Sequence, residues 1–213
     1  MGTMYAGGAD TTMSEIERSL SMLIDFQVQA GVSRDRFAPP AAEEDFAAYR
    51  EAFGEDIPAG LAEVYAVIGS GPLVTDNLIS IEQVIATRRM WDEIIAESED
   101  PDSDYHEVIT SLDPDAVSAL YWKSGWVPFT LDGGGNGFAV DMAPEPGGTA
   151  GQVINVGSDE DYRTVLGVSV ADFLARITRL VDAGRVSVAE GGYLRVDDDL
   201  SLLTALQQGR DRP

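Results

Sequence analysis

The sequence predicts an α+β fold in which N-terminal and C-terminal helices pack on a twisted, mainly antiparallel sheet. Two observations carry this prediction. Residues 126–156 contain three short apolar runs separated by glycine-rich or proline-rich turns, which is the pattern of an antiparallel meander. The segments on either side carry apolar residues at helical spacing, and no internal repeat divides the chain.

The first half of the chain is predicted to be mainly helical. Ser14 and Glu17 have the spacing of a capping box, so a helix is expected to begin there. Ser80 and Gln83 have the same spacing before another apolar run. Pro58 suits a first helical turn, and glycine follows several of the runs. The predicted helices cover residues 14–30, 42–53, 58–68 and 81 onwards, with a short strand over 78–80.

The meander is predicted to contain strands over residues 126–129, 138–140 and 152–156. Its first turn is built from glycine and asparagine because these residues tolerate a positive φ. Asp132, Asn136 and Asp141 carry oxygen atoms around this turn. Calcium needs about six to eight oxygen ligands, so a cation site is the weaker alternative. We expect the Asp and Asn side chains to hydrogen-bond the backbone of their own turn.

The last part of the chain is predicted to hold a strand over 162–166, a helix from Ser169 to about Ala183, a hairpin over 185–196 and a final helix over 200–207. Residues 1–13 are expected to form a flexible leader. Residues 14–184 are expected to form a single domain, with 185–213 as a C-terminal hairpin and short helix packed on it.

The central stretch resembles the SUKH superfamily, which includes Smi/Knr cell-wall-assembly regulators of fungi and many bacterial toxin-immunity proteins. The resemblance covers roughly residues 42–183 and rests on an ordered set of short motifs. It implies an α+β fold and a function in protein binding instead of catalysis. The residues that carry the motifs, and that are expected to be structural, are Pro58, Trp126, Pro128, Gly133, Gly134, Gly135, Asn136, Asp141 and Gly151.

The chain is strongly acidic. Thirty-seven acidic residues against fourteen basic ones give a net charge of −23 and a pI near 4.1. A field of this sign repels nucleic acid and anionic membranes, so neither is an expected partner, and it attracts cationic proteins. The alternative is that the acidity only keeps the protein soluble. Residues 92–115 are the most acidic stretch, because they hold ten acidic residues and no Lys or Arg.

No residue is predicted to be catalytic or to bind a cofactor or a metal. His106 is the only histidine and cysteine is absent, which excludes thiol chemistry, disulfides and zinc sites with two imidazoles. The glycine run lacks the Lys-Ser/Thr that follows a phosphate-binding loop. Paired carboxylates for a hydrolase stay open, since so many acids make chance pairs easy. The absence of cysteine, of a secretory signal and of a membrane-spanning run predicts a cytoplasmic location.

The leading hypothesis is a non-catalytic immunity protein that binds and neutralises a basic bacterial toxin domain. The alternatives are a regulatory scaffold of the cell-wall-assembly type and, less favoured, a carboxylate-dependent hydrolase. Trp122 is expected to be partly exposed beside the acidic stretch, where it would suit a basic partner. The oligomeric state is not predicted. The predicted partner-binding residues are Asp92, Glu93, Glu97, Glu99, Asp100, Asp102, Asp104, Glu107, Trp122 and Asp132.

Overall fold

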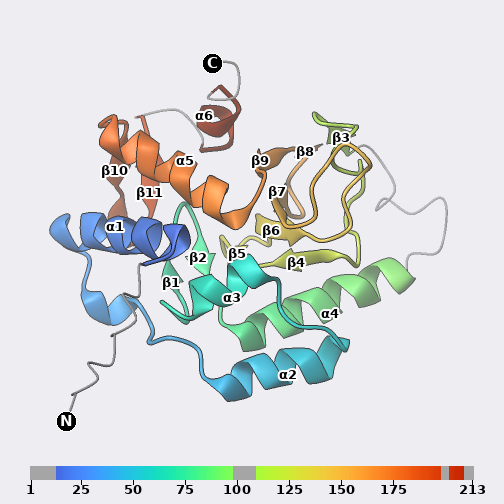
Figure 1. The fold of residues 1–213 in the computed structure, drawn as a ribbon. Coiled ribbons are helices and arrows are strands. Elements are labelled where there is room, and N and C mark those ends of the chain that lie inside the picture. Colours follow the sequence, from blue (N-terminus) through green and yellow to red (C-terminus); the bar gives the residue numbers. More distant parts are fainter. Residues whose placement is uncertain (1–12, 98–108, 198–201, 209–213) are drawn as a thin grey trace, which may run out of the picture.

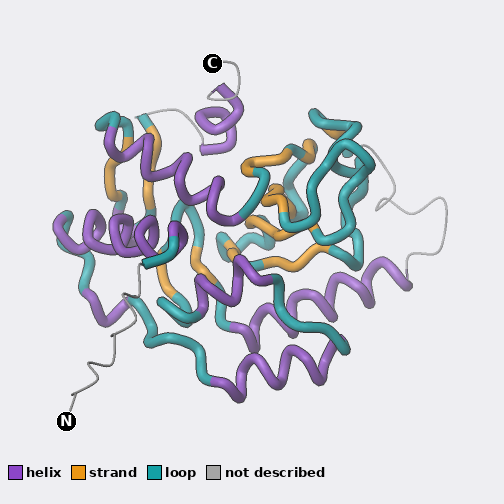
Figure 2. The backbone as a smooth tube through the Cα atoms, viewed as in Figure 1, coloured by secondary structure: helices purple, strands orange, loops and turns teal. Residues whose placement is uncertain are grey.

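The structure is a computed structural model that describes residues 13–97, 109–197 and 202–208 (Figure 1). It has the predicted α+β architecture, with strands gathered between helices on either side (Figure 2). The described helices are α1 (Glu15–Gln29), α2 (Glu43–Phe53), α3 (Ala59–Tyr65), α4 (Ile81–Glu97), α5 (Val170–Asp182) and α6 (Leu202–Gln208). Two 3-10 turns cover Arg34–Arg36 and Glu190–Gly192.

The helix starts predicted from capping residues are confirmed. The amide of Glu17 donates to Ser14 Oγ at 3.1 Å before α1. Before α4, Ser80 and Gln83 exchange hydrogen bonds of 3.0 and 3.3 Å, which satisfies two free groups of the first turn. Helix α3 begins directly after Pro58 but ends at Tyr65, earlier than predicted. The chain turns there because Gly69 and Ser70 hydrogen-bond the backbone of Ala38 instead of continuing the helix.

The central sheet has four antiparallel strands in the order β4 (Trp126–Pro128), β6 (Gly137–Asp141), β7 (Gln152–Val156) and β9 (Val165–Gly167). Val127 faces Val140 across β4 and β6, and Ala139 faces Ile154 across β6 and β7. The predicted meander is therefore confirmed.

Both faces of this sheet are buried. Along β6, Phe138 and Val140 belong to a large core with α1, α3 and α5, whereas Ala139 belongs to a second core. The second core includes Trp91 of α4 together with Trp122 and Trp126. Helix α5 packs on β7 and β9 at the first face with α1 beside it, and α4 lies against β4 on the other (Figure 1). Successive side chains of β6 point alternately into the two cores, which explains why all five residues of β6 are buried.

The predicted strand over 126–129 is observed as β4, and a short strand that was not predicted, β5 (Thr130–Leu131), follows it. Strand β5 pairs with β2 (Asn77–Leu78), itself paired with β1 (Gly71–Pro72). The hydroxyl of Thr130 accepts from the Phe138 amide at 2.8 Å, which replaces a backbone ladder bond there.

The prediction of one strand over residues 162–166 is wrong, since β8 (Tyr162–Arg163) pairs in parallel with β3 (Thr110–Ser111) while β9 pairs with β7. Thr164 lies between them. Its amide donates to Asn155 Oδ1 at 2.9 Å and its hydroxyl donates to Asp113 Oδ2 at 2.8 Å, so side chains interrupt the strand.

The predicted C-terminal hairpin is confirmed as β10 (Val186–Val188) and β11 (Leu194–Val196). Leu194, Val196 and Leu202 belong to the same core as α1 and α5. The Leu194 amide also donates to the Val74 carbonyl at 2.7 Å, so the hairpin is joined to the loop between β1 and β2. The division of the chain into leader, domain and tail stays a prediction, because residues 1–12 lie outside the described part.

Arg163 is the largest fully buried charged side chain in the described part of the chain, and it lies beside Trp126 of the second core. Its guanidinium donates to the carbonyls of Tyr121 at 2.8 Å and Glu160 at 3.0 Å, and to Gly157 O at 3.4 Å. It also lies 5.8 Å from the ring centroid of Trp126. Burial lowers the pKa of Arg163 to about 10, with the Glu160 carboxylate opposing the shift. One side chain thus joins two separate loops, the one before β4 and the one between β7 and β8.

Candidate functional site

The predicted partner-binding residues fall in three groups. Asp92, Glu93 and Glu97 lie in the last turns of α4, and Asp132 lies at the glycine-rich turn between β5 and β6. None of the described contacts of Asp132 involves α4. Five of the predicted residues lie outside the described part of the chain: Glu99, Asp100, Asp102, Asp104 and Glu107.

The expectation that Trp122 is partly exposed is wrong. Its side chain is only 4% exposed, stacks on Trp91 with ring centroids 5.8 Å apart, and meets the edge of Trp126 at 6.0 Å. Its Nε1 donates to Asp92 Oδ1 at 2.9 Å. Trp122 is buried because three indoles pack together, and the one polar atom that needs a partner has Asp92.

The glycine-rich turn is held by its own side chains, as predicted. Asp132 Oδ1 accepts from the amides of Gly134 at 2.6 Å and Asn136 at 3.0 Å, and Asp132 Oδ2 accepts from Asn136 Nδ2 at 3.0 Å. Gly133 and Gly135 have φ values of 89° and 99°, which favour glycine. Partial burial opposes ionisation of Asp132, but these hydrogen bonds prevail and lower the pKa of its carboxyl.

The other residues of the family-like motif have structural contacts. Pro58 precedes α3 as its N-cap residue, and Pro128 ends β4 opposite Ala139. Trp126 is fully buried. Gly151 donates its amide to the Asp141 carbonyl at 2.8 Å with φ 94°.

A cleft of about 510 Å³ lies beside the glycine-rich turn. Its acidic side chains come from four places: the β1–β2 loop, the glycine-rich turn, the residues before β8 and the C-terminal hairpin. Apolar side chains from β6, β11 and α6 complete the wall. The acidic residues are Asp76, Asp132, Glu160 and Glu190, and the apolar ones are Phe138, Leu194, Val196 and Leu202, with Tyr193 beside them. We call this feature the acidic cleft.

Asp76 is the most buried acid of the acidic cleft, with 7% of its surface exposed. Burial raises its pKa to about 6; the nearby Asp132 and Glu160 charges raise it further, whereas the Thr75 and Thr130 hydroxyls oppose the shift. Burial also raises the pKa of Glu160, against the hydrogen bond from Asn155 and the charge of Arg163. The acidic cleft therefore holds carboxylates that repel one another.

These carboxylates are only partly neutralised within the described ranges, because the nearby Arg163 charge acts on Glu160 without forming an ion pair with it. The ion pairs found there include none to Asp76, Asp132 or Glu160. Arg195 lines the acidic cleft, but its side chain is exposed. The same ranges hold no group of three His, Cys, Asp or Glu residues placed to hold a metal ion. The arrangement favours an extended organic cation over a metal.

We expect Asp76→Asn to stabilise the protein. A carboxyl with a raised pKa binds more protons in the folded state than in the unfolded state, so its burial lowers stability as pH rises from about 4 to about 6. At pH 7.5 the variant should gain about 2 kcal/mol in the free energy of unfolding, and about half of that at pH 5. Urea unfolding at both pH values measures this. Asp182→Asn, at an exposed position, is the control, and a destabilised Asp76→Asn protein would contradict the prediction.

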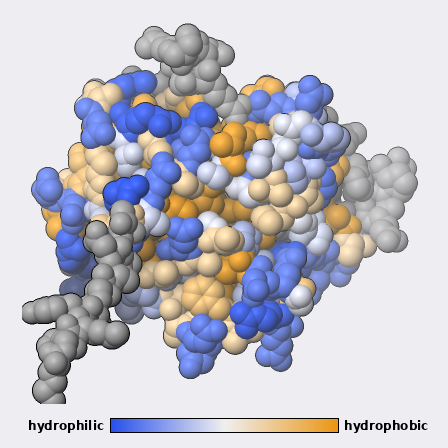
Figure 3. All heavy atoms as spheres, in the orientation of Figure 1, coloured by the Kyte–Doolittle hydropathy of each residue, from blue (hydrophilic) through white to orange (hydrophobic). Residues whose placement is uncertain are grey.

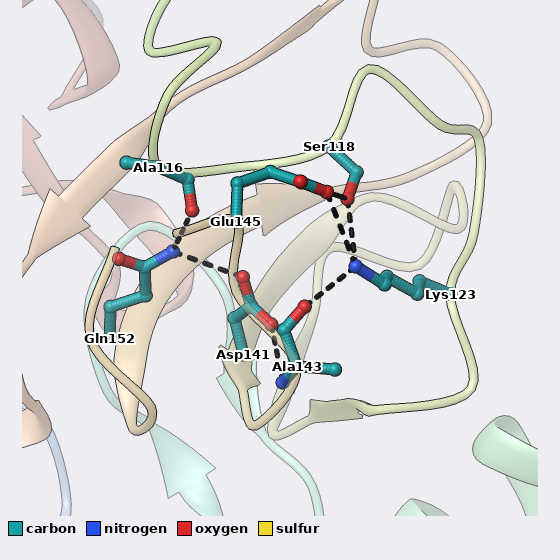
Figure 4. Close-up of polar contacts among 7 residues, drawn as sticks. All are labelled: Ala116, Ser118, Lys123, Asp141, Ala143, Glu145 and Gln152. Atoms are coloured by element: carbon teal, nitrogen blue, oxygen red, sulfur yellow. Dashed lines mark hydrogen bonds and ion pairs between the residues drawn. The ribbon is translucent and has the colours of Figure 1, made fainter. Parts of the chain in front are cut away.

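A second polar cluster surrounds the only lysine of the sequence (Figure 4). Lys123 Nζ donates to Ser118 Oγ at 2.9 Å, to the Ala143 carbonyl at 2.7 Å and to Glu145 Oε1 at 3.4 Å. Ser118 Oγ in turn donates to Glu145. A serine beside a lysine can be a nucleophile if the amine is neutral and takes the proton. Lys123 instead uses three donors on three acceptors, which is the pattern of an ammonium that holds loops together.

Asp141 connects this cluster to the sheet. It is fully buried, and its two oxygens accept from the Ala143 amide at 2.9 Å and from Gln152 Nε2 at 3.0 Å. Gln152 Nε2 also donates to the Ala116 carbonyl at 2.8 Å (Figure 4). Burial raises the pKa of Asp141, whereas these hydrogen bonds and the Lys123 charge oppose the shift. These contacts give the family-like Asp141 a structural role.

The outer surface is mixed. Figure 3 shows polar residues over most of the face in view, with apolar residues between them near its middle. None of the helices in the described part combines the length and apolar character needed to cross a membrane.

The structure combines an α+β fold with a glycine-rich turn between β5 and β6 and with the acidic cleft beside that turn. A family model described as the SMI1 / KNR4 family (SUKH-1) matches residues 40–176. The chain therefore belongs to the SMI1/KNR4 (SUKH-1) family, and the resemblance of its central motifs to the SUKH superfamily is confirmed. The match includes Asp76 and the glycine-rich turn but leaves out α1 and the C-terminal hairpin.

Three similar proteins are fungal regulators. The cell wall biosynthesis/cell cycle regulator smi1 of Schizosaccharomyces pombe is 42% identical over 80 residues, or 38% of this chain and 16% of that protein. A glucan synthesis regulatory protein of Neurospora crassa is 41% identical over 80 residues, or 38% and 15%. The cell wall assembly regulator SMI1 of Saccharomyces cerevisiae is 35% identical over 74 residues, or 35% and 15%. The matched part is thus about one sixth of each of these relatives.

Sequence reasoning missed the acidic cleft. Asp76, Glu160 and Glu190 lie far apart in the chain and share no motif, so only the fold brings them together. The one available signal is Asp132 at the glycine-rich turn, which is a predicted partner-binding residue and lines the acidic cleft.

Proposed function

We propose that this chain is a protein-binding module that acts in the cytoplasm and that binds and neutralises a basic toxin domain. The observation that carries the proposal is the acidic cleft, whose carboxylates form no ion pair among the described residues. A net charge of −23 adds a long-range attraction for a basic partner. Such attraction raises the association rate and disfavours acidic competitors.

A regulatory scaffold is the second candidate. The fungal relatives favour it, because they are named as regulators of cell wall and glucan synthesis. A scaffold would use the same acidic cleft to hold a partner without blocking its active site. The two candidates therefore share the physical basis of binding and differ in what binding does to the partner.

A carboxylate-dependent hydrolase is the third candidate, and one observation favours it. The pKa of Asp76 is raised and that of Asp132 is lowered within one cleft, as an acid and a base require. However, both oxygens of Asp132 already accept hydrogen bonds from its own turn. This engagement makes binding the better supported function.

The test is co-expression of the chain with the product of the neighbouring gene, combined with a pull-down of the two proteins. If the chain is an immunity protein, cells that express the toxin should survive only when the chain is present. Binding without rescue would support the scaffold instead. If the chain shows no binding and no rescue, both candidates are overturned.

Binding of the full chain to a basic partner should depend on salt. Raising the sodium chloride concentration from about 50 mM to about 500 mM should weaken the affinity at least about tenfold, because the attraction between exposed charges is screened. Isothermal titration at both concentrations measures this. An affinity that does not change with salt would overturn the electrostatic part of the proposal.

A further inference from the structure

The acidic cleft has the chemistry of a receptor for one long cationic side chain. We propose that it binds an arginine side chain of the partner protein, with the guanidinium against Asp76 and Glu160 and the alkyl stem along the apolar wall. This inference rests on the proposed function, because it names the group of the basic partner that is recognised.

The first argument is the uncompensated charge of Asp76. The residue is only 7% exposed, and among the described residues its carboxylate has neutral partners alone, the Thr130 hydroxyl at 3.4 Å and the Thr75 hydroxyl. In the described part of the chain no Lys, Arg or His forms an ion pair with it. A buried carboxylate without a cation lowers stability, and such costs are typical of sites kept for function. A cationic ligand would remove the cost.

The second argument is the composition of the wall. Carboxylates approach the cleft from several elements, while Phe138, Leu194 and Leu202 supply apolar surface between them. Lysine and arginine both join an apolar stem to a charged head. Arginine fits better because its planar guanidinium directs five N–H groups in different directions, whereas an ammonium acts as a point charge.

The third argument is that the walls are already fixed. Asn77 Nδ2 donates to the Tyr193 hydroxyl at 2.9 Å, and the Leu194 amide donates to the Val74 carbonyl at 2.7 Å. These bonds hold the C-terminal hairpin against the loop that carries Asp76. The opposite wall is the glycine-rich turn, locked by Asp132 and Asn136. A preformed site loses little entropy when it binds.

The two walls have different origins. Asp76 and the glycine-rich turn lie within the family match over residues 40–176, whereas Glu190, Tyr193 and Leu194 lie beyond it. The carboxylate that contacts the guanidinium thus belongs to the family region. The wall formed by the C-terminal hairpin lies outside that region and would contact the residues of the partner next to its arginine.

The affinity for arginine should rise with pH between about 5 and 7.5, because Asp76 becomes ionised over this range. The charged groups that face Asp76 are Asp132, Glu160 and Glu190 from three other elements, together with Arg195 of β11. The positive charge of Arg195 repels the arginine ligand, but the Arg195 side chain is exposed, so solvent screens this repulsion.

The experiment is an NMR titration of the ¹⁵N-labelled full chain with the blocked peptide acetyl-Ala-Arg-Ala-Ala-amide. The matched control peptide carries citrulline, which keeps the shape of arginine without its charge. The arginine peptide should shift the amides of Thr130, Asn136 and Leu194 with saturation, and bind at least about tenfold tighter than the citrulline peptide. Equal binding of the two peptides, or no binding of either, would overturn the inference.

Two variants with the same change in net charge complete the design. Asp76→Asn should weaken binding of the arginine peptide at least about tenfold, whereas Asp182→Asn at the exposed end of α5 should change it less than about twofold. Equal effects of the two variants would show that only the overall negative charge of the protein attracts the peptide, and the inference would fail. Asp76→Asn is expected to fold, and its amide spectrum verifies this.

The outcomes also separate this inference from the proposed function. If toxin rescue succeeds while the arginine peptide leaves the acidic cleft unchanged, the site is wrong and the function stands. If the peptide binds at the acidic cleft but no partner is neutralised, the site stands and the immunity function fails.

Discussion

Replacing Arg163 by methionine is expected to lower the free energy of unfolding by about 4 kcal/mol, the largest effect that the structure predicts. Methionine fills a similar volume but donates no hydrogen bond, so the carbonyls of Tyr121, Gly157 and Glu160 lose their buried donor. The contact with the Trp126 ring is lost as well. Chemical denaturation at pH 7.5 measures the change, and the melting temperature should fall by about 10 °C.

The matched control for Arg163→Met is Arg179→Met. The Arg179 side chain is 65% exposed and lies 3.9 Å from Asp172, a contact of the kind that contributes little to stability. This control should change the free energy of unfolding by less than about 0.5 kcal/mol. A loss of less than about 1 kcal/mol for Arg163→Met would show that water replaces the guanidinium, and the buried role of Arg163 would be wrong.

Replacing Gly137 by alanine is expected to cost about 3 kcal/mol. A Cβ atom at this position would lie 2.0 Å from the carbonyl oxygen of Thr130 and 2.7 Å from its carbonyl carbon. Both are backbone atoms of the central hairpin, so a side-chain movement cannot relieve the clash. Separation of the strands would also weaken the bond from the Phe138 amide to the Thr130 hydroxyl.

Gly134→Ala in the same turn is the control for Gly137→Ala. Its Cβ atom would meet only the Asp132 carboxylate, at 3.3 Å and 3.5 Å, and the Asn136 amide group. We expect a cost below about 1 kcal/mol from thermal and urea unfolding. If the two variants are equally stable, the close approach of β5 to β6 described here is wrong.

The sequence was sufficient for elements that are determined by local contacts. Ser14 and Ser80 cap their helices through residues three positions away, and Asp132 and Asn136 bond within a five-residue turn. Such interactions can be predicted from spacing alone. The three strands of the meander were also predictable, because short apolar runs between turns have few other structures.

The features that were missed depend on contacts between distant residues. Thr164 interrupts a strand because its hydroxyl donates a hydrogen bond to Asp113, 51 positions earlier. Trp122 is buried because Trp91 lies under it, and no pattern near Trp122 indicates this. The acidic cleft was missed for the same reason, since Asp76 and Tyr193 lie on different elements that only the fold places together.

The contacts of Lys123 have a practical consequence for interface mapping. The only lysine side chain donates to three acceptors and is 29% exposed, so it should react slowly with amine-directed reagents. Carboxyl activation of the chain, followed by coupling to a lysine-rich partner, should therefore give few links within the chain. Each product that joins the two proteins, when read by mass spectrometry, would identify one acidic residue of this chain and the partner amine beside it.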